Sequence, residues 1–286
     1  MMMFGKEMEP PVFMLTAVVR VADDITYVGL LFGFILLAIP IAIMRVTKLR
    51  MERESLTAIF RMTVQLFLAG LFLTVIFDMN NPVLTLLWFL MMICFAAFES
   101  IQRQGMNFRS LYLPVLASFL FGNLLILLYI NFFVIDLFNV FEARYFIPIG
   151  GILLGNSLSG NIIGVSNFYS SLKRNQNRYI SSLSFGAKMH EALLPYLRTG
   201  LRSALKPAVG DISTIGIVHL PGMMTGQLIA GSMPMLAIKY QIAVMVGVYA
   251  STVTCVTLSI LLTSWVCFDE YGMLKERMFR KDVMAG

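Results

Sequence analysis

Residues 219–231 read His-Leu-Pro-Gly-Met-Met-Thr-Gly-Gln-Leu-Ile-Ala-Gly, inside a segment that is otherwise long and apolar. Proline removes a hydrogen bond from a helix, and each glycine lowers helix stability. At membrane depth, the backbone groups freed by such breaks need partners from protein or from water in a cavity. A polar, broken helix inside a membrane is therefore expected to serve a function.

The composition of the whole chain is that of an integral membrane protein. It has 286 residues, of which 58% are hydrophobic and 13% charged, and its mean hydropathy is +0.79. A soluble protein of ordinary composition is about 25% charged. We predict an all-α integral membrane protein with one domain over residues 27–268.

Long apolar runs give the number of membrane spans. A bilayer core about 30 Å thick needs about 20 apolar residues per helix. This criterion predicts seven transmembrane helices: Tyr27–Met44, Leu56–Phe77, Pro82–Phe98, Leu111–Phe133, Tyr145–Asn167, Pro207–Ala230 and Tyr240–Phe268. Residues 1–26 form an N-terminal segment before them, and residues 269–286 form a C-terminal tail.

The distribution of basic residues predicts the orientation. Most Lys and Arg residues lie in 45–53, 103–109, 173–206 and 275–281. Loops rich in these residues are cytoplasmic, so the N-terminus is expected outside and the C-terminus in the cytoplasm. The net charge of +6 is explained as an orientation signal, and no nucleic-acid partner is expected. The one long cytoplasmic loop is 168–206, and loops of that length are usually functional.

Polar residues and breaks within the last spans are candidates for a transport path or gate. They are Asn156, Asp211, His219, Pro221, Gly222, Gly226 and Gln227. Asp211 and His219 are eight residues apart, so one helix would place them on about the same face. Helix packing explains the same residues, since G-x-x-x-G spacings such as Gly160/Gly164 let helices approach closely. Both interpretations stay open.

Two further features have a functional and a structural interpretation. His219, Met223 and Met224 are weak candidates for metal ligands, because thioethers and imidazoles bind soft or borderline metals. Adjacent methionines point in different directions on a helix, which favours packing. Arg61 lies inside the second span; it either reaches back to the interface or pairs with an acid such as Glu99 or Asp211.

Motifs for catalysis are missing from the sequence. It has no Ser/His/Asp arrangement, no H-E-x-x-H and no G-x-x-x-x-G-K-[ST]. We therefore expect a protein that is not an enzyme, has no catalytic residues, binds no cofactor and does not hydrolyse ATP itself.

The long loop carries a family resemblance. Residues 181–192 read Ser-Ser-Leu-Ser-Phe-Gly-Ala-Lys-Met-His-Glu-Ala, and a basic run then leads to Pro207. This resembles the coupling segment of ABC-transporter permeases, with Gly186-Ala187 and Glu191-Ala192 matching and Ser181/Ser182 in place of the usual acidic residue. With residues 220–227 and 237–242, the chain from about Ile43 to Leu261 resembles the FetB-like permease family. That family includes bacterial permeases assigned to iron export and plant aluminium-tolerance permeases.

The resemblance implies a mechanism and partners. Seven spans with an external N-terminus are implied, with a P-loop ABC ATPase as a separate chain and a complex of two permease copies with two ATPase subunits. A rigid coupling helix, 181–194, would dock on the ATPase through Ser182, Gly186, Ala187, Glu191 and Ala192, and Pro207 would pass the movement into the sixth span. ATP would act through that partner, and a metal, with iron as the expected substrate, would be exported across a bacterial inner membrane.

Two alternatives remain from the sequence. The first is an ABC permease for an organic substrate such as a nucleotide sugar. The second is a non-transporting membrane scaffold or sensor. The presence of a neighbouring gene for a lone P-loop ATPase would separate the scaffold from the two permeases.

Overall fold

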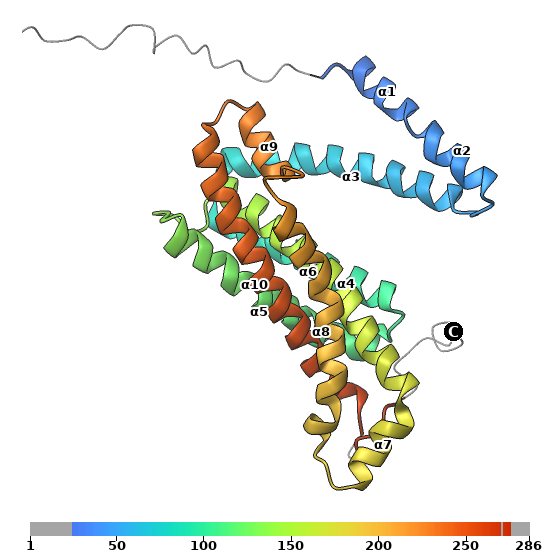
Figure 1. The fold of residues 1–286 in the computed structure, drawn as a ribbon. Coiled ribbons are helices and arrows are strands. Elements are labelled where there is room, and N and C mark those ends of the chain that lie inside the picture. Colours follow the sequence, from blue (N-terminus) through green and yellow to red (C-terminus); the bar gives the residue numbers. More distant parts are fainter. Residues whose placement is uncertain (1–24, 270, 276–286) are drawn as a thin grey trace, which may run out of the picture.

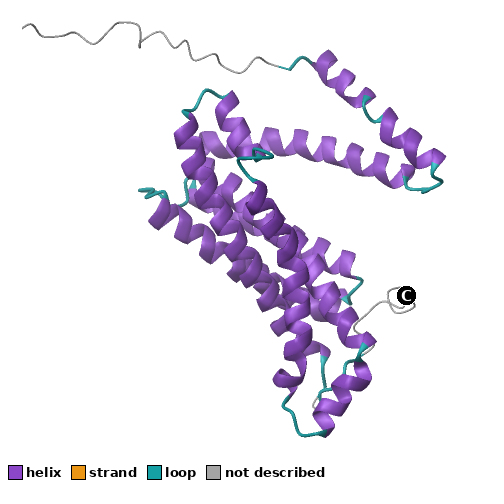
Figure 2. Cartoon of the chain, in the orientation of Figure 1, coloured by secondary structure: helices purple, strands orange, loops and turns teal. Residues whose placement is uncertain are grey.

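Helices form nearly all of the regular structure in residues 25–269 and 271–275, the part of the chain that the computed structural model describes (Figures 1 and 2). Their bounds are α1 Tyr27–Ile35, α2 Ala38–Val46, α3 Glu52–Met79, α4 Pro82–Gln104, α5 Phe108–Tyr129, the π-helical turn η2 Ile130–Val134, α6 Ala143–Arg174, α7 Gln176–Ser184, α8 Met189–Thr214, α9 Gly222–Ile229 and α10 Pro234–Cys267. The predicted N-terminal segment and most of the predicted tail lie outside the described residues.

The ends of the apolar helices follow from local sequence. Asn81 accepts a hydrogen bond from the Val83 amide, and Pro82 occupies the first helical position of α4. Gly105 ends α4 with a φ of 64°, a conformation that costs glycine little. Asn107 then caps α5 by accepting from the Arg109 amide. Side-chain capping satisfies backbone donors that a helix start leaves free.

Six helices in the described residues are long and apolar enough to cross a membrane: Tyr27–Val46, Glu52–Met79, Pro82–Gln104, Phe108–Val134, Ala143–Arg174 and Pro234–Cys267. They correspond in position to six of the seven predicted spans. An all-helical membrane protein is thus confirmed, with six such helices where the sequence predicted seven.

The predicted sixth span, Pro207–Ala230, is wrong as a single helix. The structure starts α8 at Met189, carries it through Pro207 to Thr214, and then leaves helical geometry until Gly222. Pro207 lies within α8 rather than opening a helix, since a proline removes one hydrogen bond and the other backbone bonds of the helix continue past it. The break falls where Gly216 takes a φ of 84°.

Helices α4–α10, here called the body, form one packed unit (Figure 1). Its centre holds fully buried aromatic side chains: Phe89, Phe119, Phe146 and Phe168. Small residues let the longest helices approach closely. A Cβ built on Gly160 would lie 2.5 Å from Thr252 of α10, and one on Gly164 would lie 2.6 Å from Val256. From the first contact to the second, the residue numbers increase in both α6 and α10, so these two helices are parallel. Helix α8, which lies between them in the sequence, runs in the opposite direction.

Helices α1–α3, here called the arm, stand away from the body (Figure 1). No residue of α1 or α2 is buried, and Ile76 is the single buried residue of α3. Ile76 packs with Ala143 and Ile147 at the start of α6. The arm is therefore joined to the body chiefly at one end of α3.

Candidate functional site

The predicted coupling segment forms a helical hairpin, here called the tip (residues 176–192). A single helix over 181–194 is wrong, because α7 ends at Ser184 and α8 begins at Met189. Gly186 has a φ of 88°, its amide donates to the Leu183 carbonyl at 2.9 Å, and the Ala187 amide donates to the Ser182 carbonyl at 3.1 Å. This pair of bonds is a Schellman motif, which ends helices at a glycine in left-handed conformation.

Glu191 fixes the start of α8. The Lys188 amide donates to Glu191 Oε2 at 2.9 Å, so the carboxylate satisfies a backbone donor at the helix entrance. Its negative charge also lies at the helix N-terminus, where the helix dipole favours an anion. Two residues selected for coupling, Gly186 and Glu191, thus define the geometry of the turn between the helices.

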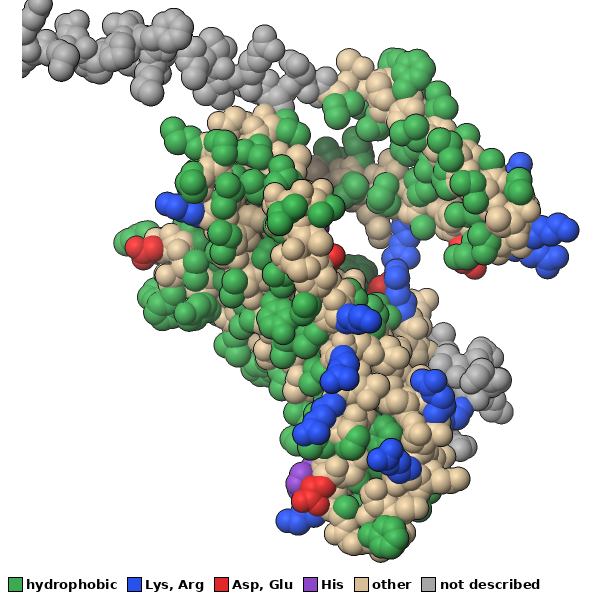
Figure 3. Space-filling model, in the orientation of Figure 1, with side chains coloured by type: hydrophobic (Ala, Val, Ile, Leu, Met, Phe, Trp, Pro, Cys, Tyr) green, Lys and Arg blue, Asp and Glu red, His purple; other side chains and the backbone are tan. Residues whose placement is uncertain are grey.

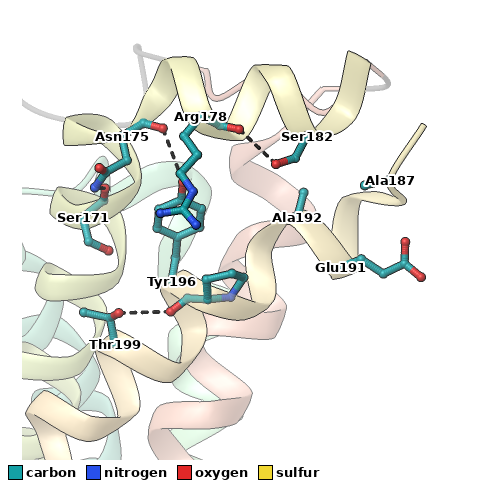
Figure 4. A pocket seen from close by; sticks show the side chains of 10 residues that line it. Ser171, Asn175, Arg178, Ser182, Ala187, Glu191, Ala192, Tyr196 and Thr199 are labelled. Atoms are coloured by element: carbon teal, nitrogen blue, oxygen red, sulfur yellow. Dashed lines mark hydrogen bonds between the residues drawn. The ribbon is translucent and has the colours of Figure 1, made fainter. Parts of the chain in front are cut away.

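A pocket of about 400 Å³ opens between the end of α6, α7 and the start of α8 (Figure 4). It is lined by Ser171, Asn175, Arg178, Ser182, Ala187, Glu191, Ala192, Pro195, Tyr196 and Thr199. Four of the five predicted coupling residues are among these, and Gly186 lies in the adjoining turn. Figure 4 shows the Arg178 side chain directed toward the Tyr196 ring, whereas Glu191 points away from both.

Two tyrosines join the tip to the neighbouring segments of the chain. The Tyr196 hydroxyl donates to the Asn175 carbonyl at 3.3 Å, and the Tyr179 hydroxyl donates to the Gly272 carbonyl at 2.8 Å. Their rings meet edge-on with centroids 6.3 Å apart. Burial, together with the nearby charge of Asp269, raises the pKa of Tyr179 to about 12. The hydroxyl therefore stays protonated and keeps its bond to residue 272 over the physiological range.

The outer surface of the tip combines an aromatic side chain with positive charge. Phe185 is 90% exposed at the turn. Basic residues follow the adjoining parts of α6, α7 and α8: Lys173, Arg174, Arg178, Lys188, Arg198, Arg202 and Lys206. Figure 3 shows this gathering of Lys and Arg over the lower part of the molecule, where the tip lies. The tip thus offers an exposed hydrophobic group at the end of a basic region, features suited to a protein partner with an acidic surface.

The predicted path or gate residues do not form one face. Asp211 is exposed in the last turn of α8, while His219 is exposed in the non-helical link 215–221. The shared helix face is therefore wrong, because the chain leaves helical geometry at Ile215 and the Gly216 amide donates to the His219 carbonyl.

The remaining candidates lie around the short helix α9. Pro221 precedes α9, and no heavy atom lies within 4 Å of a Cβ built on Gly222 or Gly226. Close helix packing at this G-x-x-x-G spacing is therefore absent within the described chain. Gln227 is half-buried and its Oε1 has no hydrogen-bond partner.

The weak metal candidates are likewise separate. Met224 is buried at 7% exposure, Met223 is half-buried on another side of α9, and His219 is exposed in the preceding link. In the described ranges, no group of three His, Cys, Asp or Glu residues could hold a metal ion. Asn156 is exposed and donates only to the Ile152 carbonyl of its own helix.

A buried polar network in the body was missed by the sequence analysis. Asn161 of α6 bonds to Ser100 and Gln104 of α4 and to Ser259 of α10. Ser259 also bonds to Ser118 of α5, so four helices meet through neutral side chains. Ser157, one turn before Asn161, donates to Asn123 of α5 at 2.9 Å. The signal in the sequence was the spacing of Ser157 and Asn161, which are four residues apart and therefore lie on one face of α6.

Residues 27–268 match a family described as "Uncharacterised protein family (UPF0014)". The chain belongs to this family. It is 29% identical over 251 residues to the UPF0014 membrane protein YjkA of Bacillus subtilis, covering 87% of this chain and 98% of that protein.

Two other UPF0014 relatives carry descriptive names. Protein ALUMINUM SENSITIVE 3 of Arabidopsis thaliana is 32% identical, covering 78% of this chain and 79% of its own length. The probable iron export permease protein FetB of Escherichia coli is 30% identical, covering 78% of this chain and 85% of its own. No solved structure matches the chain. The suspected resemblance to FetB-like permeases is confirmed, and this UPF0014 chain is a multi-pass membrane protein of a family that includes a named permease.

Proposed function

We propose that this chain is the permease subunit of an ABC transporter, with ATP bound and hydrolysed by a separate P-loop chain. The observation that carries the proposal is the tip. Its turn is fixed by Gly186 and Glu191, and it presents Phe185 at the end of a basic region. A stiff projecting hairpin of this kind is suited to insertion into a groove of a partner that moves.

The path from the tip to the body is continuous. Helix α8 runs without interruption from Met189, beside Glu191, to Thr214, beyond Asp211. Movement of the ATPase at the tip would reach Asp211 and the link 215–221 along one helix. We propose the cytoplasmic side for the tip, with two copies of this chain and two ATPase subunits in a bacterial inner membrane.

The proposed substrate is a metal ion, exported from the cell, with iron as the first candidate. This part rests on the relationship to FetB, because the described residues supply no cluster of three ionisable ligands. Iron content and iron tolerance should be measured in cells with and without the chain and its ATPase. Equal content and equal tolerance would count against metal, and uptake assays with nucleotide sugars would then test the organic alternative.

The ATPase partnership has its own experiment. The chain is co-expressed with the candidate ATPase, and Gly186→Val and Glu191→Lys are compared with Asn177→Ala, which changes an exposed residue near the other end of α7. We expect both tip variants to lower co-purification of the ATPase and ATP-coupled transport by tenfold or more, while Asn177→Ala retains both. Full complex formation and transport in both tip variants would contradict the docking role and favour a scaffold or sensor.

A further inference from the structure

The arm exposes a membrane helix with a charged face. Helix α3 has 28 residues and is therefore about 42 Å long, but Ile76 near its end is its one buried side chain. Asn80, which follows α3, accepts a hydrogen bond from the Ala143 amide at 3.4 Å. The end of α3 is thus attached to the body, and the rest of the helix is available to another surface.

Arg61 and Gln65 lie four residues apart on α3, and hence on one face. Both side chains are exposed, and both lie within a helix apolar enough to span a membrane. The described chain contains one ion pair, Arg103 with Glu99, so Glu99 is occupied and Arg61 is unpaired. A charged residue at membrane depth is costly unless it meets an opposite charge, water or backbone carbonyls.

A complementary surface lies on the body. Asp211 of α8 is exposed and makes no ion pair in the described residues. Next to it, a groove of about 380 Å³ separates α8 from α10 and is lined by Ile212, Ile215, Gln241, Ile242, Met245, Val246 and Tyr249. Gln241 is only 5% exposed, yet its Oε1 has no hydrogen-bond partner. A buried amide oxygen without a donor is costly in apolar surroundings.

The two surfaces match in chemistry. Arg61 and Gln65 offer a cation and an amide donor, while Asp211 and Gln241 offer an anion and an amide acceptor. On each surface the charged residue and the amide lie close together, since Gln65 is one helical turn from Arg61 and Gln241 lines the groove that begins at Ile212, next to Asp211.

We propose that α3 of one copy packs in the α8–α10 groove of a second copy, where its Arg61 pairs with the second copy's Asp211. Gln65 then donates to the orphan oxygen of Gln241 in the second copy. Two-fold symmetry forms the contact twice in the dimer. Like the proposed transporter, this dimer contains two copies of the chain. Its formation requires neither the ATPase nor a substrate.

Cysteine cross-linking in membranes tests the contact directly. Cys94, the one exposed native cysteine of the described chain, is replaced by serine; Cys255 and Cys267 are buried and are retained. Two differently tagged copies carry Arg61→Cys and Asp211→Cys, respectively, and are expressed together without the ATPase. An Arg–Asp ion pair holds the two Cβ atoms farther apart than a disulfide spans, so a short bifunctional thiol reagent is added. It should give a cross-linked species of twice the chain mass that carries both tags.

The matched control is Thr63→Cys with Asp211→Cys, because residue 63 lies on the opposite face of α3. We expect at least tenfold less cross-linked product from this pair. Equal yields from the two pairs would overturn the proposal. A single chain carrying both Arg61→Cys and Asp211→Cys gives the remaining outcome: a cross-link formed by the same reagent at monomer mass would show that the arm folds onto its own body, which would overturn the contact between copies.

Charge reversal provides a second measurement. Arg61→Asp or Asp211→Arg alone should lower the dimer fraction in mild detergent at least fivefold, and the double variant should restore it. Arg61→Lys should keep most of the dimer. Undiminished dimer in both single variants would overturn the pairing, as would a double variant that remains monomeric. Because this readout is assembly of the chain alone, loss of transport with an intact dimer would count against the proposed function instead.

Discussion

Gly200 of α8 lies directly against Gly164 of α6. A Cβ built on Gly200 would lie 2.7 Å from the Gly164 carbonyl oxygen, and one built on Gly164 would lie 3.0 Å from the Ala204 Cβ. The obstacle at Gly200 is backbone, which a side-chain rotation cannot move. This contact sets the distance between α6 and α8 at this level.

Gly200→Leu is therefore expected to destabilise the protein by about 1–3 kcal/mol or more, since overpacking forces the helices apart. The measurement is the melting temperature of the purified chain in detergent. Gly210→Leu on the same helix is the matched control, because no heavy atom lies within 4 Å of a Cβ at that position. Equal losses in the two variants would contradict a specific role for the Gly164–Gly200 contact.

Asn161→Ala should lower stability by about 1–3 kcal/mol, because it removes buried hydrogen bonds to Ser100, Gln104 and Ser259. Asn167→Ala is the control: the Asn167 amide donates to the Ile163 carbonyl of its own helix. Thermal unfolding in detergent compares the two variants. A smaller effect at Asn161 than at Asn167 would rule out the network as a source of stability.

Gly186→Val should cost about 1–2 kcal/mol, because a β-branched residue is strained at a φ of 88°. Gly186→Asn should cost clearly less, since asparagine tolerates the left-handed region. Space around the position is not limiting, as no heavy atom lies within 4 Å of the added Cβ. Melting temperatures of the two variants test this order, and equal values would contradict a conformational cause.

The raised pKa of Tyr179 predicts that the folded protein loses stability in alkaline solution. Its pKa in the folded protein is about 12, above that of an exposed tyrosine near 10, so between these values the folded chain binds the proton more tightly than the unfolded chain. Stability from this group is complete below about pH 10 and decreases as the pH rises toward 12. Tyr179→Phe should remove this component. The difference in melting temperature between wild type and variant should shrink above pH 10; a constant difference would refute the assignment.

Apolar runs predicted the positions of the six long helices, because a membrane span depends on the length and mean hydropathy of one continuous segment. The sixth predicted span failed for a different reason. Pro207 was interpreted as a helix start, yet α8 continues through it to Thr214, and the break falls at Gly216 instead. Hydropathy could not locate this break, since the link 215–221 is itself largely apolar.

Site residues that are close in sequence were also predicted better than those that meet only in the folded chain. The coupling residues came together around one pocket because they are close in sequence and Gly186 sets a local turn. Asp211 and His219 were placed on one helix that the chain does not form. Asn161 was missed because its role depends on Ser100 and Ser259, which are distant in sequence and meet it only after the helices pack.

Gly200 lies midway along α8 between the tip and Asp211. Gly200 lies eleven residues from Met189 at the tip and eleven residues from Asp211, about 16 Å in either direction. With the close Gly164–Gly200 contact as its pivot, a tilt of the helix by about 10° would move the two ends by about 3 Å in opposite directions. A displacement of the Met189 end would thus appear at Asp211 with equal size and reversed sense, without any bending of the helix.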